Sequence, residues 1–121
     1  MVEVAVQVVR LEEFAEIARE ARCWFAIEML SRRKAHIVLQ AEGPDGDGGY
    51  VFYREVRYVG LDLPRLIRSY EERYGVAFDG DFWLTVLDLA REMLKDLMSK
   101  LEVMGVRTRE GRYFRVLSPI A

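Results

Sequence analysis

The sequence predicts a single-domain α+β protein, a two-layer sandwich in which helices cover one face of a mixed sheet. Two patterns lead to this expectation: short segments with alternating apolar residues indicate strands, and longer segments with apolar residues at helical spacing indicate helices. They follow one another in the order β-α-β-β-α-α-β-β. At 121 residues the chain can bury a core without disulfides or structural metals. We therefore expect one domain over residues 1–121.

The first expected element is a half-buried strand at residues 2–9, where every second residue is valine. The following residues are rich in Ala, Glu, Arg, Leu and Met, which favour helices, and no glycine or proline interrupts them. These observations favour one long helix from Leu11 to about Arg33. A buried strand over residues 23–30 stays open as the alternative, because nearly all of those residues are apolar.

A β-hairpin is expected next. Residues 35–42 alternate, the segment EGPDGDGG at residues 42–49 has strong turn chemistry, and YVFYREVRYV at residues 50–59 is rich in aromatic and β-branched residues. A short helix is expected at residues 63–74, with Asp62 as its cap and Pro64 at its first position. The first strand, the crossover helix and the next strand should form a right-handed parallel or next-but-one pair, a ferredoxin-like start that the hairpin extends.

The longest expected element is a helix between Asp79 and Val106, around which the rest of the chain is arranged. Apolar residues recur at helical spacing at Trp83, Val86, Leu87, Ala90, Leu94, Leu97, Met98, Leu101 and Met104. Asp79 and Asp81 are candidate N-caps, and Gly105 fits the C′ position of a Schellman cap in which Val106 contacts Leu101. The two long helices would lie side by side on one face of the sheet.

The chain closes with VRTREGRYFRVL, residues 106–117, in which Glu110-Gly111 fits a two-residue turn between short strands. We expect a C-terminal β-hairpin in which Arg109 faces Arg112. Together with the preceding helix, residues 93–117 resemble the recognition helix and wing of winged-helix DNA-binding domains. This chain departs from that pattern, because its helix is longer and no short helix with a tight turn precedes it. The resemblance implies nucleic-acid contact through the hairpin.

Residues suited to catalysis are scarce in this chain. The one histidine, His36, is expected on the outward side of a strand with no evident partner for general-base chemistry. The one cysteine, Cys23, lies among bulky apolar residues and is expected to be a buried, unreactive thiol. No nucleophile–base pair can be assembled from this set. The sequence predicts no catalytic residues, and a non-enzyme is favoured over an enzyme.

Metal and cofactor binding are not expected either. One histidine and one cysteine cannot supply a closed zinc shell. Asp45 and Asp47 alternate before Gly48 as in a calcium loop, but Gly43 and Arg54 occupy the positions where an EF-hand has further acids. The acids at the start of the long helix are explained by capping and the helix dipole. We therefore predict no metal and no cofactor.

Composition narrows the class of protein. The net charge of −2 and the pI near 5.5 argue against a generally basic protein that coats nucleic acid, but they allow a local basic patch. The chain has no asparagine, and a lack of thermolabile amides together with dense mixed charge is typical of heat-adapted proteins. Its excess of arginine, fifteen against three lysines, is given just as well by a GC-rich genome. The single cysteine indicates a reducing compartment, and we find no signal peptide and no apolar run approaching ~20 residues. We expect a cytoplasmic protein without membrane contact.

Two basic clusters are the candidate binding residues: Arg32, Arg33 and Lys34 before the first hairpin, and Arg107, Arg109 and Arg112 near the C-terminus. Guanidinium groups suit phosphate oxygens and stay charged at any working pH. The sequence therefore predicts a small intracellular, non-catalytic binding protein that contacts nucleic acid through these arginines. Two other interpretations of the second cluster stay open: a solvated edge hairpin that blocks aggregation, and contact with an acidic protein.

The alternative function is that of a structural or adaptor subunit. The long helix carries apolar residues beyond its main stripe, at Phe82, Leu84, Leu89, Met93 and Val103. A sheet of four or five strands is only about 20 Å across and cannot cover a helix of roughly 36 Å in every orientation. We therefore expect a homo- or hetero-oligomer, with a homodimer favoured, that forms through the long helices.

Overall fold

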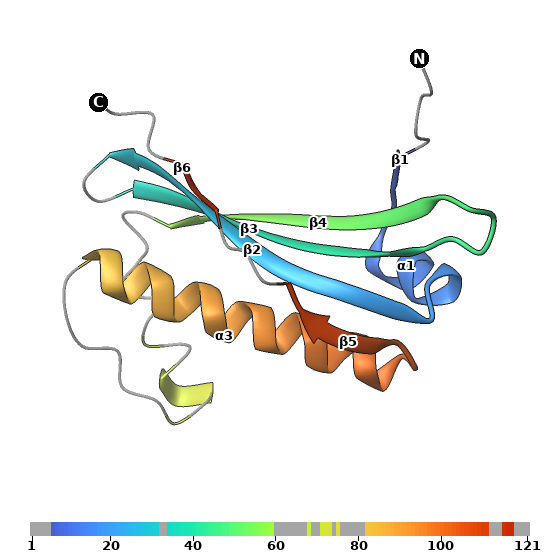
Figure 1. Cartoon of the computed structure of the whole chain (residues 1–121). Helices are drawn as coiled ribbons and strands as arrows, with labels where there is room; N and C mark the ends of the chain where they lie inside the picture. The colour runs from blue at the N-terminus through green and yellow to red at the C-terminus, as the bar shows by residue number, and fades with distance from the viewer. Residues whose placement is uncertain are drawn as a thin grey trace, which may run out of the picture.

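The computed structural model describes residues 6–31, 34–59, 68, 71–73, 75, 82–111 and 115–117, and it confirms an α+β fold with a mixed sheet (Figure 1). The elements are β1 (Val6–Val8), α1 (Leu11–Ile17), β2 (Glu20–Ser31), β3 (Lys34–Pro44), β4 (Tyr50–Val59), α3 (Phe82–Val103), β5 (Arg107–Glu110) and β6 (Arg115–Leu117). Most of the helix expected at residues 63–74 lies outside the described residues, although residues 68 and 71–73 are helical.

The sheet has six strands in the order β1-β4-β3-β2-β5, and β6 also pairs with β2. Strands β2, β3 and β4 form an antiparallel meander, with Phe25 opposite Leu39 and Leu39 opposite Glu55. Strand β1 is parallel to β4, and it lies next-but-one to β3 but runs in the opposite direction. The parallel arrangement expected for the first strand and residues 35–42 is therefore wrong, because β2 reverses the chain once more between them.

The long first helix expected from Leu11 to Arg33 is also wrong, because the helix ends at Ile17 and the extended backbone of Ala18 leads into β2. Helix propensity is a weak local preference, and pairing with β3 from Arg22 onward overrides it. The alternative strand at residues 23–30 is the correct interpretation, with Cys23 and Phe25 buried. In the part of the chain that the structure describes, α3 is thus the one long helix.

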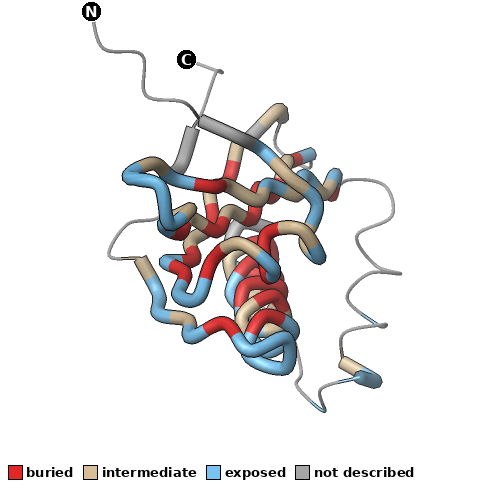
Figure 2. The backbone as a smooth tube through the Cα atoms, turned by 90° about the vertical axis from the view of Figure 1, so that its right-hand side faces the viewer, coloured by how far each residue is buried: buried red, intermediate tan, exposed pale blue. Residues whose placement is uncertain are grey.

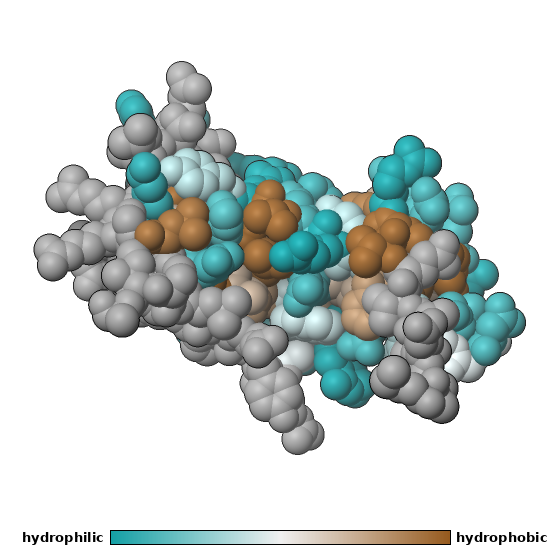
Figure 3. Space-filling view, turned by 90° about the horizontal axis from the view of Figure 1, so that it is seen from above, coloured by the Kyte–Doolittle hydropathy of each residue, from teal (hydrophilic) through white to brown (hydrophobic). Residues whose placement is uncertain are grey.

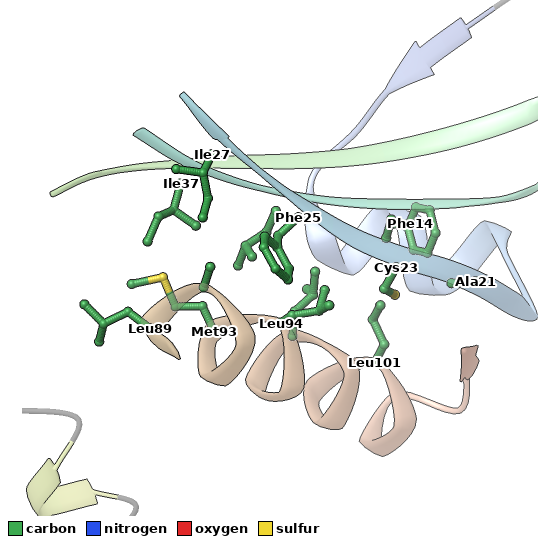
Figure 4. Close-up of a cluster of buried hydrophobic side chains, with 14 of the residues drawn as sticks. Phe14, Ala21, Cys23, Phe25, Ile27, Ile37, Leu89, Met93, Leu94 and Leu101 are labelled. Atoms are coloured by element: carbon green, nitrogen blue, oxygen red, sulfur yellow. The ribbon is translucent and has the colours of Figure 1, made fainter. Parts of the chain in front are cut away.

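The core lies between the sheet and the two helices α1 and α3, which share one face. Figure 4 shows side chains from α1 and the strands pointing toward the side chains on α3. Among the fully buried side chains are Phe14, Ile27, Ile37, Leu89, Met93 and Leu101. Figure 2 shows the buried residues concentrated along α3 and the strands beside it. None of the helices that the structure describes is long and apolar enough to cross a membrane.

The C-terminal cap of α3 follows the Schellman pattern predicted from the sequence. Gly105 has a φ of +90°, where a residue with a Cβ is strained. The amide of Val106 donates a hydrogen bond to the carbonyl oxygen of Leu101 at 2.9 Å, and the amide of Gly105 donates one to the carbonyl oxygen of Glu102 at 3.0 Å. Leu101 and Val106 are both buried in the core. The N-cap candidates Asp79 and Asp81 lie outside the described residues.

The C-terminal hairpin is absent. Strands β5 and β6 both run parallel to β2, with Arg107 opposite Glu20 and Arg115 opposite Ala26, so the chain does not reverse at Glu110-Gly111. Instead the amide of Gly111 donates to the carbonyl of Cys23 at 2.7 Å and continues the same edge. The free backbone groups of β2 give the chain leaving α3 a partner that a separate hairpin lacks. The resemblance to a winged-helix wing therefore fails.

Candidate functional site

The candidate site lies on the sheet face opposite α1 and α3, which we call the open face. Alternation along the strands directs to it Arg22, Trp24, Ala26 and Glu28 of β2, His36, Val38, Gln40 and Glu42 of β3, and Tyr50, Phe52, Arg54, Val56 and Tyr58 of β4. No helix within the described ranges covers this face (Figure 1). Seen from this side, patches of hydrophobic side chains alternate with hydrophilic ones (Figure 3).

A hollow of about 580 Å³ opens at the end of this face where β2 begins, and we call it the arginine hollow. Its charged side chains are Arg22, Arg107, Arg109, Glu20 and Glu42, and its other lining residues are Ala21, Gly43, Pro44, Tyr50 and Thr108. A volume of this size is within the range of ordinary ligand clefts. It therefore brings three guanidinium groups, two carboxylates and an aromatic ring to one place.

Strand register explains how these arginines meet. Strand β5 pairs with β2 so that Arg109 is opposite Arg22 and Arg107 is opposite Glu20. On the other side, Arg22 is opposite Glu42, which is in turn opposite Phe52. One row of side chains thus crosses four strands, a distance of about 14 Å at a strand spacing of ~4.8 Å. Its members, in order from β5 to β4, are Arg109, Arg22, Glu42 and Phe52.

The arginines of the hollow make no ion pair with any residue that the structure describes. The ion pairs among the described residues lie elsewhere, for example between Arg57 and Glu55 at 2.6 Å and between Lys100 and Asp96 at 3.2 Å. Like charges directly opposite each other on neighbouring strands are destabilising. Arg109 lies opposite Arg22, and neither makes an ion pair with a residue that the structure describes, although Glu42 lies on the other side of Arg22. This arrangement favours an anion between the two arginines.

Only part of the predicted arginine set comes together. Arg107 and Arg109 line the hollow, whereas Arg112, Arg32 and Arg33 lie outside the described residues. Lys34 is exposed at the start of β3, at the opposite end of the sheet and roughly 35 Å from the start of β2 at ~3.3 Å per residue. The described residues of the two predicted clusters therefore do not form one surface.

Sequence reasoning missed Arg22 and Glu42, as well as the aromatic side chains beside them. Arg22 was assigned to a helix, so its place on a sheet face could not be foreseen. A signal was present in residues 50–58, where alternation places Tyr50, Phe52 and Tyr58 on one face. The hairpin prediction alone assigns no function to that face.

Glu102, in the last turn of α3, connects this helix to β5 through hydrogen bonds. The backbone amide and the hydroxyl of Thr108 both donate to Glu102 Oε1, each at 2.8 Å. These two hydrogen bonds, the backbone one first, lower the pKa of the Glu102 carboxyl below its usual value. Because Thr108 lies between Arg107 and Arg109 on β5, this contact helps to position these two arginines at the hollow.

We expect Glu102 to make stability depend on acid. Its lowered pKa means that the ionised carboxylate stabilises the fold at pH values above its ordinary pKa, and that this stabilisation is lost as the pH falls through the lowered value. Glu102→Gln should therefore lower the melting temperature near pH 7, and should lose less on acidification to about pH 3 than the wild type does. Glu16→Gln, at an exposed position of α1, is the control. Parallel melting curves for E102Q and the wild type across this pH range would contradict the assignment.

Cys23 is fully buried, which confirms the expected buried thiol. Burial, and to a smaller extent the charge of Glu102, raises its pKa to about 12. His36 differs from expectation, because its Nδ1 lies 3.6 Å from Oε2 of Glu28 and its ring meets that of Tyr58 edge-on at 5.8 Å. The expectation that this histidine has no partner is therefore wrong.

The loop after β3 is shaped by Asp45. Its carboxylate accepts hydrogen bonds from the amides of Asp47 at 2.7 Å and Gly49 at 3.0 Å, so it is engaged within the loop itself. Among the described residues, no three His, Cys, Asp or Glu side chains lie together so that they could hold a metal ion.

Comparison of the chain with protein-family models, with curated proteins and with solved structures gave no match. The functional argument therefore rests on the geometry and charge of the site.

Proposed function

We propose that this protein is a non-catalytic binding protein that holds single-stranded nucleic acid on its open face. The observation that supports it most is the arginine hollow, where Arg22, Arg107 and Arg109 converge and make no ion pair with a residue that the structure describes. Guanidinium groups bind phosphate through paired hydrogen bonds and remain charged at any working pH.

Aromatic side chains beside the hollow favour a single strand over a duplex. Tyr50 lines the hollow and is 47% exposed, and Trp24 and Phe52 are half-buried on the same face. Tyr58 is 49% exposed on this face but lies at the other end of β4. Unpaired bases stack on such rings, whereas the bases of a duplex are already stacked on one another. An open sheet that carries aromatic rings next to a basic hollow is a suitable surface for a short unpaired segment.

The proposal predicts weak, salt-dependent binding. With about three phosphates contacted, the logarithm of the binding constant should fall with that of the salt concentration with a slope of roughly −2 for a single strand. We expect the triple variant Arg22→Gln, Arg107→Gln, Arg109→Gln to weaken binding at least about tenfold and to flatten this slope, because each charge-assisted hydrogen bond contributes about 1.5–3 kcal/mol. The measurement is fluorescence anisotropy with labelled oligonucleotides.

The matched control removes the same charge elsewhere. Arg10, Arg68 and Arg91 are exposed and lie outside the hollow, so changing all three to Gln should leave the affinity nearly unchanged. Circular dichroism verifies that both variants fold. Absence of binding to any single strand at about 50 mM salt, or equal effects of the two triple variants, would refute the proposal.

The second candidate is an adaptor subunit that assembles with a second copy or with an acidic protein. Leu89 and Met93, two of the apolar residues expected to need a second subunit, are instead buried in the core. They therefore give no reason to expect an oligomer. Leu84 and Val103 remain 48% and 89% exposed on α3. A dimeric mass in light scattering at micromolar concentration would favour this candidate, and a monomeric mass would remove its homodimer form.

A further inference from the structure

The arginine hollow contains two carboxylates, which a site for phosphate alone does not explain. Glu20 and Glu42 line it together with the three arginines, and the described residues provide neither carboxylate with an ion pair. Carboxylates repel a bound phosphate. A ligand that suits this hollow therefore brings hydrogen-bond donors as well as negative charge.

Glu42 is the carboxylate that most needs a partner. Glu20 is exposed and can be solvated, whereas Glu42 is half-buried and has no hydrogen bond to any residue that the structure describes. Burying a charged group without a partner is unfavourable. The side chain lies beside Arg22 on one neighbouring strand and Phe52 on the other. A donor-bearing ligand seated there would satisfy the carboxylate.

We propose that the arginine hollow selects guanine, with Glu42 accepting from guanine N1–H and N2–H and Arg22 donating to guanine O6 and N7. The inference rests on the proposed function and names the base that the site prefers. Arg107 and Arg109, on the neighbouring β5, bind a phosphate of the oligonucleotide that carries this guanine. Phe52 and Tyr50 supply the stacking surface.

Hydrogen-bonding chemistry singles out this base. Guanine presents two adjacent donors that match the two oxygens of a carboxylate, and two adjacent acceptors that match the fork of a guanidinium. In adenine and cytosine the amino donor lies next to a ring acceptor, and in uracil the single N3–H lies between two carbonyl oxygens. Each of these places an acceptor against the carboxylate of Glu42, which is repulsive.

The test uses short labelled oligouridylates that carry one central guanosine, adenosine, cytidine or inosine, measured by fluorescence anisotropy with the intact protein. We expect the guanosine strand to bind about tenfold more tightly than the adenosine strand, which is the discrimination of one good bidentate contact. Inosine, which lacks the N2 amino group, should lie between them. Glu42→Gln should abolish the preference while leaving the salt slope in place. Glu16→Gln removes the same charge at an exposed position of α1 outside the hollow and should retain the preference.

The outcomes separate the two proposals. If all strands bind with equal affinity to the wild-type protein, guanine selection is overturned and the proposed function stands. If no strand binds, both are overturned. The comparison of the strands on the wild-type protein decides the question without any variant, so a folding defect in E42Q does not affect it. Competition by guanosine 5′-monophosphate but not by adenosine 5′-monophosphate would give independent support, and equal competition would contradict the inference.

Discussion

Phe14→Ala is expected to lower the free energy of unfolding by about 3–5 kcal/mol, the usual effect of removing a large aromatic side chain from a core. Phe14 is fully buried and packs in the cluster that joins α1 to the sheet and α3 (Figure 4). Helix α1 has only seven residues and no side-chain cap, so it cannot persist without this packing. Chemical denaturation followed by circular dichroism measures the loss.

The control for this variant is Glu16→Ala on the exposed side of the same helix. Surface substitutions of this kind usually change stability by less than about 0.5 kcal/mol. If Phe14→Ala were as mild as Glu16→Ala, α1 would not be docked on the sheet in solution, and the position of the start of β2, which lines the arginine hollow, would be in doubt.

Features governed by local signals were predictable from the sequence. The apolar repeat of α3 is a 3.6-residue period that no neighbouring element alters, and Gly105 indicates its end because only glycine adopts that conformation readily. The β3–β4 hairpin was predicted for the same reason, because alternating strands flank a glycine-rich turn.

Features governed by distant partners were not predictable. The residues of β2 favour a helix on composition, and their strand conformation comes from pairing with β3 on one edge and with β5 and β6 on the other. The supposed hairpin at Glu110-Gly111 failed in the same way, because a turn-forming dipeptide cannot reveal that an open strand edge lies nearby.

The candidate site depends both on local signals and on distant partners. The density of arginines in the sequence identifies Arg107 and Arg109, but the hairpin expected from the sequence wrongly places them opposite Arg112 and its neighbours. Arg22 and Glu42 join them through strand register alone. A site assembled from register across several strands is thus the part of the molecule that a single sequence reveals least.

The base of the arginine hollow depends on a glycine. Gly43 is buried on β3, and a Cβ at this position would lie 2.7 Å from the Cβ of Ala18 and would collide with the carbonyl oxygen of Glu20. Ala18 lies in the connection between α1 and β2, and Glu20 is the first residue of β2. Neither a Cβ nor a backbone carbonyl can rotate aside as the end of a flexible side chain could. The absence of a side chain at Gly43 is therefore what allows β2 to begin so close to β3.

We accordingly expect Gly43→Ala to destabilise the protein by about 1–3 kcal/mol, the range for overpacking a tight site. It should also weaken oligonucleotide binding, because the displaced segment carries Glu20 and Arg22 into the hollow. Gly111→Ala is the control, since the nearest atom to its added Cβ is 3.3 Å away on Trp24 and no left-handed backbone is involved. Thermal melting measures the stability of both variants, and fluorescence anisotropy measures their affinity for the oligonucleotide. Equal losses of stability and affinity in the two variants would show that the strand pair tolerates a side chain between Gly43 and Glu20.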